Sequence, residues 1–168
     1  MKISLFVVLL GLGLGACLEK TETASPVSDI LHDENSAAKV AAAFVDALAV
    51  KRNPNAAWGL LAVGTQAELP PPKLAEILRN MHPKGYPGRV QASQFEPLPG
   101  QKRMNVYVDG TGEDGFSYQV VLEGDSGAGY RVLAIHRSEG GPFPPSKSKH
   151  PLKGGAAGGG RKAGLSGK

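Results

Sequence analysis

The sequence predicts one α+β domain, in which three N-terminal helices pack on one face of a four-stranded antiparallel sheet. Between residues 36 and 81, apolar residues recur every three to four positions, which is the period of helices with one buried face. After Gly88 the period changes to two, as in strands, and short turns rich in Gly or Pro separate the apolar runs. Short turns between consecutive strands indicate antiparallel hairpins, and helices followed by strands are typical of α+β domains.

The first predicted helix covers residues 36–52 and has the clearest pattern. Asn35 or Ser36 can supply the side-chain oxygen that caps its N-terminus, and Asn53-Pro54 ends it. Its apolar residues have the spacing of one buried face, which consists of Ala37, Val40, Ala41, Phe44, Ala47 and Leu48.

Two shorter helices are predicted over residues 55–62 and 73–81. The first contains Trp58 and ends before Gly64, and the rigid segment Pro70-Pro71-Pro72 connects it to the second. The second helix has one apolar face, which consists of Leu74, Ile77, Leu78 and Met81.

Four strands are predicted over residues 89–96, 102–109, 116–123 and 130–137. Alternation is clearest in the second strand, where Met104, Val106 and Val108 share one face. The intervening turns are predicted at residues 97–100, 110–115 and 124–129.

The N-terminal residues 1–16 have the layout of a secretory signal peptide. Lys2 provides a positive charge, an apolar stretch follows, and small residues precede Cys17. The apolar stretch from Ile3 to Leu14 would be about 18 Å long as a helix, whereas a bilayer core is roughly 30 Å thick. It is therefore too short to be a comfortable transmembrane helix.

The end of this segment, Leu14-Gly15-Ala16-Cys17, resembles the lipobox of bacterial lipoproteins. The resemblance implies cleavage after Ala16, lipid attachment to the Cys17 thiol, and acylation of the new amino terminus, with palmitate as the expected fatty acid. Leu18 is not the Asp that commonly retains lipoproteins at the inner membrane, so the expected location is the outer membrane, facing the periplasm. Residues 17–35 would then be the lipidated Cys and a flexible acidic tether.

Residues 36–138 resemble the NTF2-like (cystatin-like, cone-shaped α+β) superfamily. The resemblance depends on the Ala-rich first helix, the Trp58-Gly59-Leu60-Leu61 stretch, and a last strand that contains Tyr130-Arg131-Val132-Leu133-Ala134-Ile135. It implies a helix-covered, curved antiparallel sheet. This superfamily includes enzymes, binding modules and assembly proteins, so the resemblance alone does not assign an activity.

Residues 139–168 form a tail rich in Gly, Pro and Lys, for which we expect disorder because it has few apolar residues to bury. The net charge of +4 originates in this tail, and residues 17–137 are close to neutral. A folded basic face for nucleic acid is therefore not expected. The tail could contact anionic surfaces of the envelope, or it could only increase solubility.

Candidate catalytic residues are few. His136, in the last predicted strand, is expected to share a face with Tyr130, Val132 and Ala134. With Tyr118 it is a candidate for acid-base chemistry in a cone pocket; a solvent-facing His at a strand end is the simpler interpretation. No metal or cofactor site is expected, because no two of the four histidines have the spacing of metal ligands: His32, His82, His136 and His150.

The expected function is therefore that of a non-enzymatic envelope lipoprotein that binds a protein or a small apolar ligand on the periplasmic side. Its lipid would attach it to the membrane. Two alternatives stay open. One is a small-molecule enzyme that uses a cone pocket, and the other is an envelope assembly or inhibitor protein that binds one protein partner.

Overall fold

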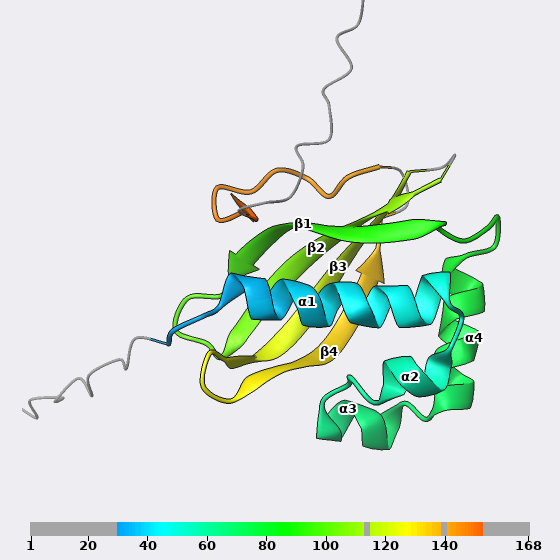
Figure 1. The fold of residues 1–168 in the computed structure, drawn as a ribbon, viewed down its shortest axis with the longest axis horizontal. Coiled ribbons are helices and arrows are strands. Elements are labelled where there is room, and N and C mark those ends of the chain that lie inside the picture. Colours follow the sequence, from blue (N-terminus) through cyan, green and yellow to red (C-terminus); the bar gives the residue numbers. More distant parts are fainter. Residues whose placement is uncertain (1–29, 113–114, 139–140, 153–168) are drawn as a thin grey trace, which may run out of the picture.

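The computed structural model describes residues 30–112, 115–138 and 141–152, and Figure 1 shows their arrangement. They form an α+β fold with a five-stranded antiparallel sheet in the order β4-β3-β2-β1-β5. The predicted signal peptide, lipidated Cys17, most of the tether, and residues 153–168 of the predicted tail lie outside the described residues. Within the described ranges, no helix has the length and hydropathy needed to cross a membrane.

The helical elements precede the four long strands along the chain. They are α1 (Glu34–Val45), the π-helical turn η1 (Asp46–Val50), α2 (Pro54–Trp58), α3 (Val63–Glu68) and α4 (Pro71–Met81). The strands are β1 (Arg89–Pro97), β2 (Arg103–Thr111), β3 (Phe116–Asp125), β4 (Gly129–Arg137) and the two-residue β5 (His150–Pro151).

The first helix begins earlier than predicted, because Asp33 caps it instead of Asn35 or Ser36. The Asp33 carboxylate accepts the backbone N–H groups of Asn35 at 3.0 Å and Ser36 at 3.3 Å. The helix also does not continue regularly to Arg52. After Val45 it widens into η1, in which the N–H of Lys51 bonds to the carbonyl of Asp46 at 2.8 Å.

The prediction of three helices missed α3. None of its residues is buried and no side chain caps its N-terminus, so it carries no apolar period that a sequence pattern could reveal. Its link to α2 is reciprocal, since the Trp58 indole donates to the Gln66 carbonyl at 3.3 Å and the Gln66 amide donates to the Trp58 carbonyl at 2.9 Å. The next helix, α4, begins at Pro71 because Pro is tolerated in a first helical turn.

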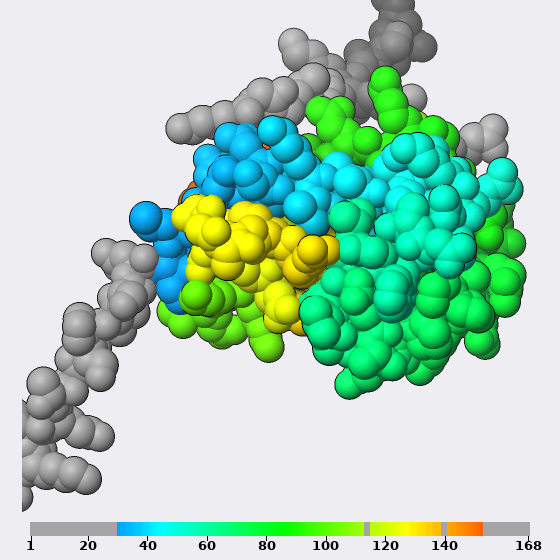
Figure 2. Space-filling view, turned by 60° about the horizontal axis from the view of Figure 1, so that its bottom comes forward, coloured from blue at the N-terminus to red at the C-terminus, as the bar shows by residue number. Residues whose placement is uncertain are grey.

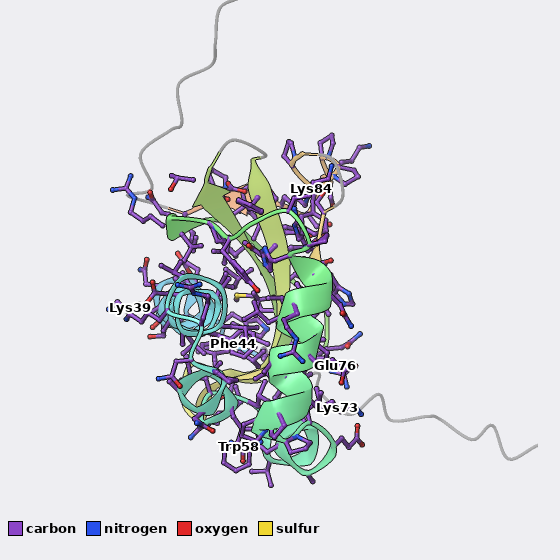
Figure 3. All side chains as sticks on the ribbon, turned by 90° about the vertical axis from the view of Figure 1, so that its right-hand side faces the viewer. Lys39, Phe44, Trp58, Lys73, Glu76 and Lys84 are labelled. Carbon is purple, nitrogen blue, oxygen red and sulfur yellow. The ribbon has the colours of Figure 1, made fainter. Side chains whose placement is uncertain are left out.

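The core lies between the helices and one face of the sheet, where α1 crosses the strands (Figure 1). The predicted inward residues Met104, Val106 and Val108 are all fully buried. Figure 3 shows Phe44 in the interior beside α1, whereas Lys39 lies at the periphery. The largest fully buried side chains are Tyr118, Phe44, Leu48, Leu74, Met104 and Leu122.

Part of the predicted disordered tail is ordered against the sheet. Residues 141–152, here called the C-terminal strap, run to β5, which pairs with β1 (Figure 1). Phe143 packs on Tyr107 with ring centroids 5.6 Å apart, and Leu152 is buried. The prediction was wrong for this stretch because the few apolar side chains within it suffice, together with backbone pairing, to hold it on an existing sheet edge.

The turn between β3 and β4 depends on a glycine. Gly124 has φ +128°, and a Cβ there would overlap the carbonyl oxygen of Gly129. We expect Gly124→Ala to lower the free energy of unfolding by more than about 2 kcal/mol in urea denaturation. The matched control is Gly64→Ala in exposed α3, where a Cβ meets nothing within 4 Å. It should raise stability by about 0.5–1 kcal/mol, and equal effects of the two changes would contradict this account.

Candidate functional site

The side of the sheet that faces the helices is filled by side chains. Met104, Val120 and Leu122, which would line a cone pocket at this position, have no exposed surface. Close packing of this kind leaves room for neither substrate nor water. The groups that can meet a ligand must therefore be sought at the sheet edges and on its other face.

Tyr118 lies in the packed interior, where its hydroxyl is 3.2 Å from Nε2 of His82. Nδ1 of His82 is 3.0 Å from the Gly85 carbonyl, which can only accept, so Nδ1 carries the proton and Nε2 accepts from Tyr118. Burial lowers the pKa of His82, and the nearby charge of Arg137 lowers it further. Burial also raises the pKa of Tyr118, so both groups are neutral at neutral pH.

Arg137 completes this cluster. Its guanidinium donates to the Met81 carbonyl at the C-terminal end of α4 and lies 4.9 Å from the centroid of the Phe116 ring. A cation at a helix C-terminus interacts favourably with the helix dipole. The cluster therefore fastens the end of α4, and the loop that follows it, to β3 and β4. Sequence analysis identified Tyr118 but missed His82 and Arg137.

A bulge in β4 explains why Arg137 was missed, and it corrects the predicted position of His136. Val132 pairs with Leu122 but Ala134 pairs with Val121, so Leu133 is an extra residue and the alternation changes sides. Arg137 consequently pairs with inward-facing Tyr118, whereas His136 pairs with Gln119 on the opposite face and is exposed. The expectation that His136 shares a face with Val132 was wrong, and the structure does not bring His136 and Tyr118 together.

The two outer strands differ in how their edges are covered. On β4, the segment between α2 and α3 bonds to the edge, since the Ala62 N–H donates to the Val132 carbonyl at 2.8 Å and the Val132 N–H to the Leu60 carbonyl at 3.0 Å. On β1, β5 pairs only with Gln94 and Phe95. The described residues thus provide no cross-strand partner on this side for Arg89–Ala92.

A groove of about 430 Å³ lies where this part of β1, the neighbouring residues of β2 and the strap meet, and we call it the edge groove. Its charged groups are Arg89 and Asp109, and the latter accepts a hydrogen bond from Ser117 at 2.9 Å. Apolar walls come from Val90 and from Phe143 of the strap. The groove is lined by residues 89–94 of β1, Tyr107 and Asp109–Thr111 of β2, and Pro142, Phe143, Pro151 and Leu152 of the strap.

One contact between the strap and the sheet is the hydrogen bond from Ser146 to Glu96. The carboxylate accepts hydrogen bonds from the Tyr107 hydroxyl at 2.8 Å, the Ser146 hydroxyl at 2.8 Å and the Asn105 amide at 3.3 Å. Burial alone would raise the pKa of Glu96, but these hydrogen bonds outweigh it and the pKa is lowered. Above Tyr107 lies the ammonium group of Lys149, 3.9 Å from the ring centroid.

A second hollow lies at the opposite end of β2, near the point where the described chain begins. Its lining has mixed charge, because Arg103 on β2 and Arg131 on β4 are the cross-strand neighbours of Glu123 on β3. Lys102 is occupied by an ion pair with Asp125 at 2.7 Å. The mixed charges give this hollow no preference for one kind of ion.

In the described part of the chain, no three His, Cys, Asp or Glu side chains cluster as they would around a metal ion. Comparison with protein-family models, with curated proteins and with solved structures found no match. Within the described residues, the candidate site therefore has two parts: the edge groove beside Arg89–Ala92, which have no cross-strand partner on the strap side, and the adjoining surface of Glu96 and Tyr107 that the strap covers.

Burial of neutral His82 predicts a pH-dependent stability. Its ordinary pKa is 6.5 and its pKa in the fold is lower, so below pH 6.5 the unfolded state binds the proton more strongly. The free energy of unfolding should fall as the pH decreases from 7.5 to 5.5. We expect His82→Gln to remove most of this slope in urea titrations. The control His136→Gln, at an exposed position, should keep it; an unchanged slope in His82→Gln would refute the assignment.

The contacts of Glu96 predict how firmly the strap is held. Glu96→Ala removes its bond to Ser146 and disturbs Tyr107 beneath Lys149. Because each lost bond to a charged group contributes about 1.5–3 kcal/mol, amide hydrogen exchange in the strap should accelerate about tenfold or more. Exposed Glu76 on α4 is the control, and Glu76→Ala should leave the strap unchanged. Equal exchange in both variants would show that Glu96 does not hold the strap.

Proposed function

We propose that the protein is a lipoprotein of the bacterial envelope, anchored through Cys17 to the outer membrane on the periplasmic side. In this proposal its NTF2-like domain is a non-enzymatic module that binds an extended segment of a protein partner. The lipobox-like residues Leu14–Cys17 support the anchor. Helices followed by an antiparallel sheet support the NTF2-like assignment.

The edge groove is the observation that carries the binding role. A strand edge without a partner presents backbone N–H and C=O groups, and extended peptides bind such edges by adding a strand. Here Arg89–Ala92, which have no cross-strand partner on the strap side among the described residues, line the groove together with side chains of β2 and the strap. A protein segment fits this geometry better than a small apolar ligand, because a groove beside a backbone edge offers main-chain hydrogen bonds along its length.

Support for the enzyme alternative is weaker. The helix-facing side of the sheet is filled, and the two candidate catalytic residues, His136 and Tyr118, point to opposite faces. The assembly or inhibitor alternative is compatible with the edge groove, since both roles require capture of one protein partner.

The point at which the described chain begins is compatible with an anchored domain. The described chain enters beside the β3–β4 turn, where the Ser126 N–H donates to the Leu31 carbonyl at 2.9 Å and the Asp33 N–H donates to the Tyr130 hydroxyl at 2.7 Å. Figure 2 shows the start of α1, in blue, beside this turn, in yellow. The edge groove begins at Arg89, at the other end of β1 from the turn that leads to β2. A flexible tether over residues 18–29, about 12 residues, would reach on the order of 20 Å and would leave the groove accessible.

In-cell crosslinking tests both parts of the proposal. A photoreactive residue at position 91, in the groove, should give a discrete protein adduct in the membrane fraction, whereas the same probe at exposed Lys39 on α1 should not. In a Cys17→Ala variant, metabolic labelling with a fatty-acid analogue should disappear and the protein should leave the membrane fraction. Labelling that persists without Cys17 would refute the anchor, and identical adduct patterns at positions 91 and 39 would refute protein binding in the groove.

A further inference from the structure

The C-terminal strap lies on the sheet in the way a bound peptide would. It pairs with an outer strand through its backbone, places an aromatic ring on Tyr107, and donates one hydroxyl to a carboxylate. We propose that the edge groove and the adjoining Glu96–Tyr107 surface bind an extended, lysine-bearing segment of a partner protein, which displaces the strap. This inference rests on the proposed function and specifies the chemistry of its ligand.

The backbone contacts of the strap are few, which makes it displaceable. β5 has two residues, and Pro151 has no N–H to donate. The Leu152 N–H donates to the Ser93 carbonyl at 3.1 Å, and the described chain ends there. An incoming strand that continues along β1 to Arg89 gains main-chain hydrogen bonds that the described part of the strap does not make.

The charge of the surface selects a cation. Lys149 places its ammonium group 3.9 Å from the centroid of Tyr107, and the phenol beneath it donates to the Glu96 carboxylate. A negative carboxylate behind an aromatic face favours Lys or Arg and disfavours Asp or Glu. The lowered pKa of Glu96 keeps this carboxylate charged at neutral pH.

The remaining contacts define the rest of the ligand. Ser146 fills one acceptor position of Glu96, so a hydroxyl or amide donor is needed near the lysine. Phe143 covers Tyr107, which is only 6% exposed although it lies on the face away from the helices. When the strap is displaced, the groove loses the lining residues that the strap contributes, including Phe143. The incoming segment must then supply an apolar side chain to cover Tyr107 again.

Competition between the strap and a partner follows from mass action. While the strap is bound, only the open fraction of molecules can accept the segment, and the apparent dissociation constant is raised by the inverse of that fraction. Weakening the strap without changing the sheet should therefore tighten binding in trans.

A peptide with the sequence of residues 141–152 is a suitable probe, since it contains each contacting group. Fluorescence anisotropy would compare its binding to the full-length protein and to the full-length variant Phe143→Ala/Ser146→Ala/Lys149→Ala, in which the sheet is intact. We expect the variant to bind the peptide at least about tenfold more tightly. Adding Glu96→Ala to this variant should remove the gain. The single change Lys149→Ala should give a smaller gain in the same direction, which keeps the test valid should the triple variant fold poorly.

The peptide itself provides a matched control for the role of charge. Substituting Lys149 by Ala in the peptide should weaken binding about fivefold or more, whereas substituting Lys147, for which the structure shows no such aromatic partner, should have little effect. Equal losses at both positions would show general electrostatic attraction and would overturn the site.

Two other results would also overturn the proposal. Equal affinity of the peptide for wild-type protein and strap variant would show that the strap does not compete. A wild-type dimer in sedimentation experiments that is lost in the strap variant would show that the occupant is the strap of a second copy. Failure of these assays, with position-specific adducts still formed at residue 91 in cells, would leave the proposed binding function intact and reject only the ligand chemistry. Loss of both would reject the groove altogether.

Discussion

Burial of one face of the β2–β3 pair beneath the helices is the constraint on which the rest of the fold depends. Met104, Val106, Val120 and Leu122 point into this layer, and none retains exposed surface. Once a sheet commits one face to a close-packed core, polar chemistry is confined to its edges and its other face. The segment between α2 and α3 also covers the β4 edge at Val132. The β1 edge is left to the strap, and this is why the candidate site is there.

The polar groups inside this layer contribute to its packing. The Tyr118 hydroxyl donates a hydrogen bond to His82, and Arg137 donates one to the Met81 carbonyl at the end of α4. Nε of Arg137 is buried without a hydrogen-bond partner among the described residues, so this network is not completely satisfied. It also holds the loop before β1 in position, so the strand that borders the groove begins from a fixed point.

The alternation of apolar residues was sufficient to predict the α+β class, the four long strands and the inward face of β2, because core burial imposes those periods directly. Alternation did not predict which face a side chain occupies where an extra residue interrupts it. Leu133 adds a residue to β4 and exchanges the faces of His136 and Arg137, and no local composition marks it. Likewise α3 buries nothing, and the strap is ordered only by surfaces that distant parts of the chain create. The candidate site was missed because strap and edge are far apart in sequence.

The hydrogen bond between Asp33, near the start of the described chain, and Tyr130 has a mechanical consequence. Asp33 is bonded to Tyr130 at the start of β4, whereas the edge groove borders β1, three strands away. For a domain held on its N-terminal side and engaged at β1, a pulling force has two routes: along α1, which follows Asp33 in the chain and packs on β1, and sideways through the β4–β3, β3–β2 and β2–β1 ladders in series. Their hydrogen bonds would then be loaded along their own direction, one pair after another. Beneath them, α1 touches all four long strands and acts as a brace that shares the load.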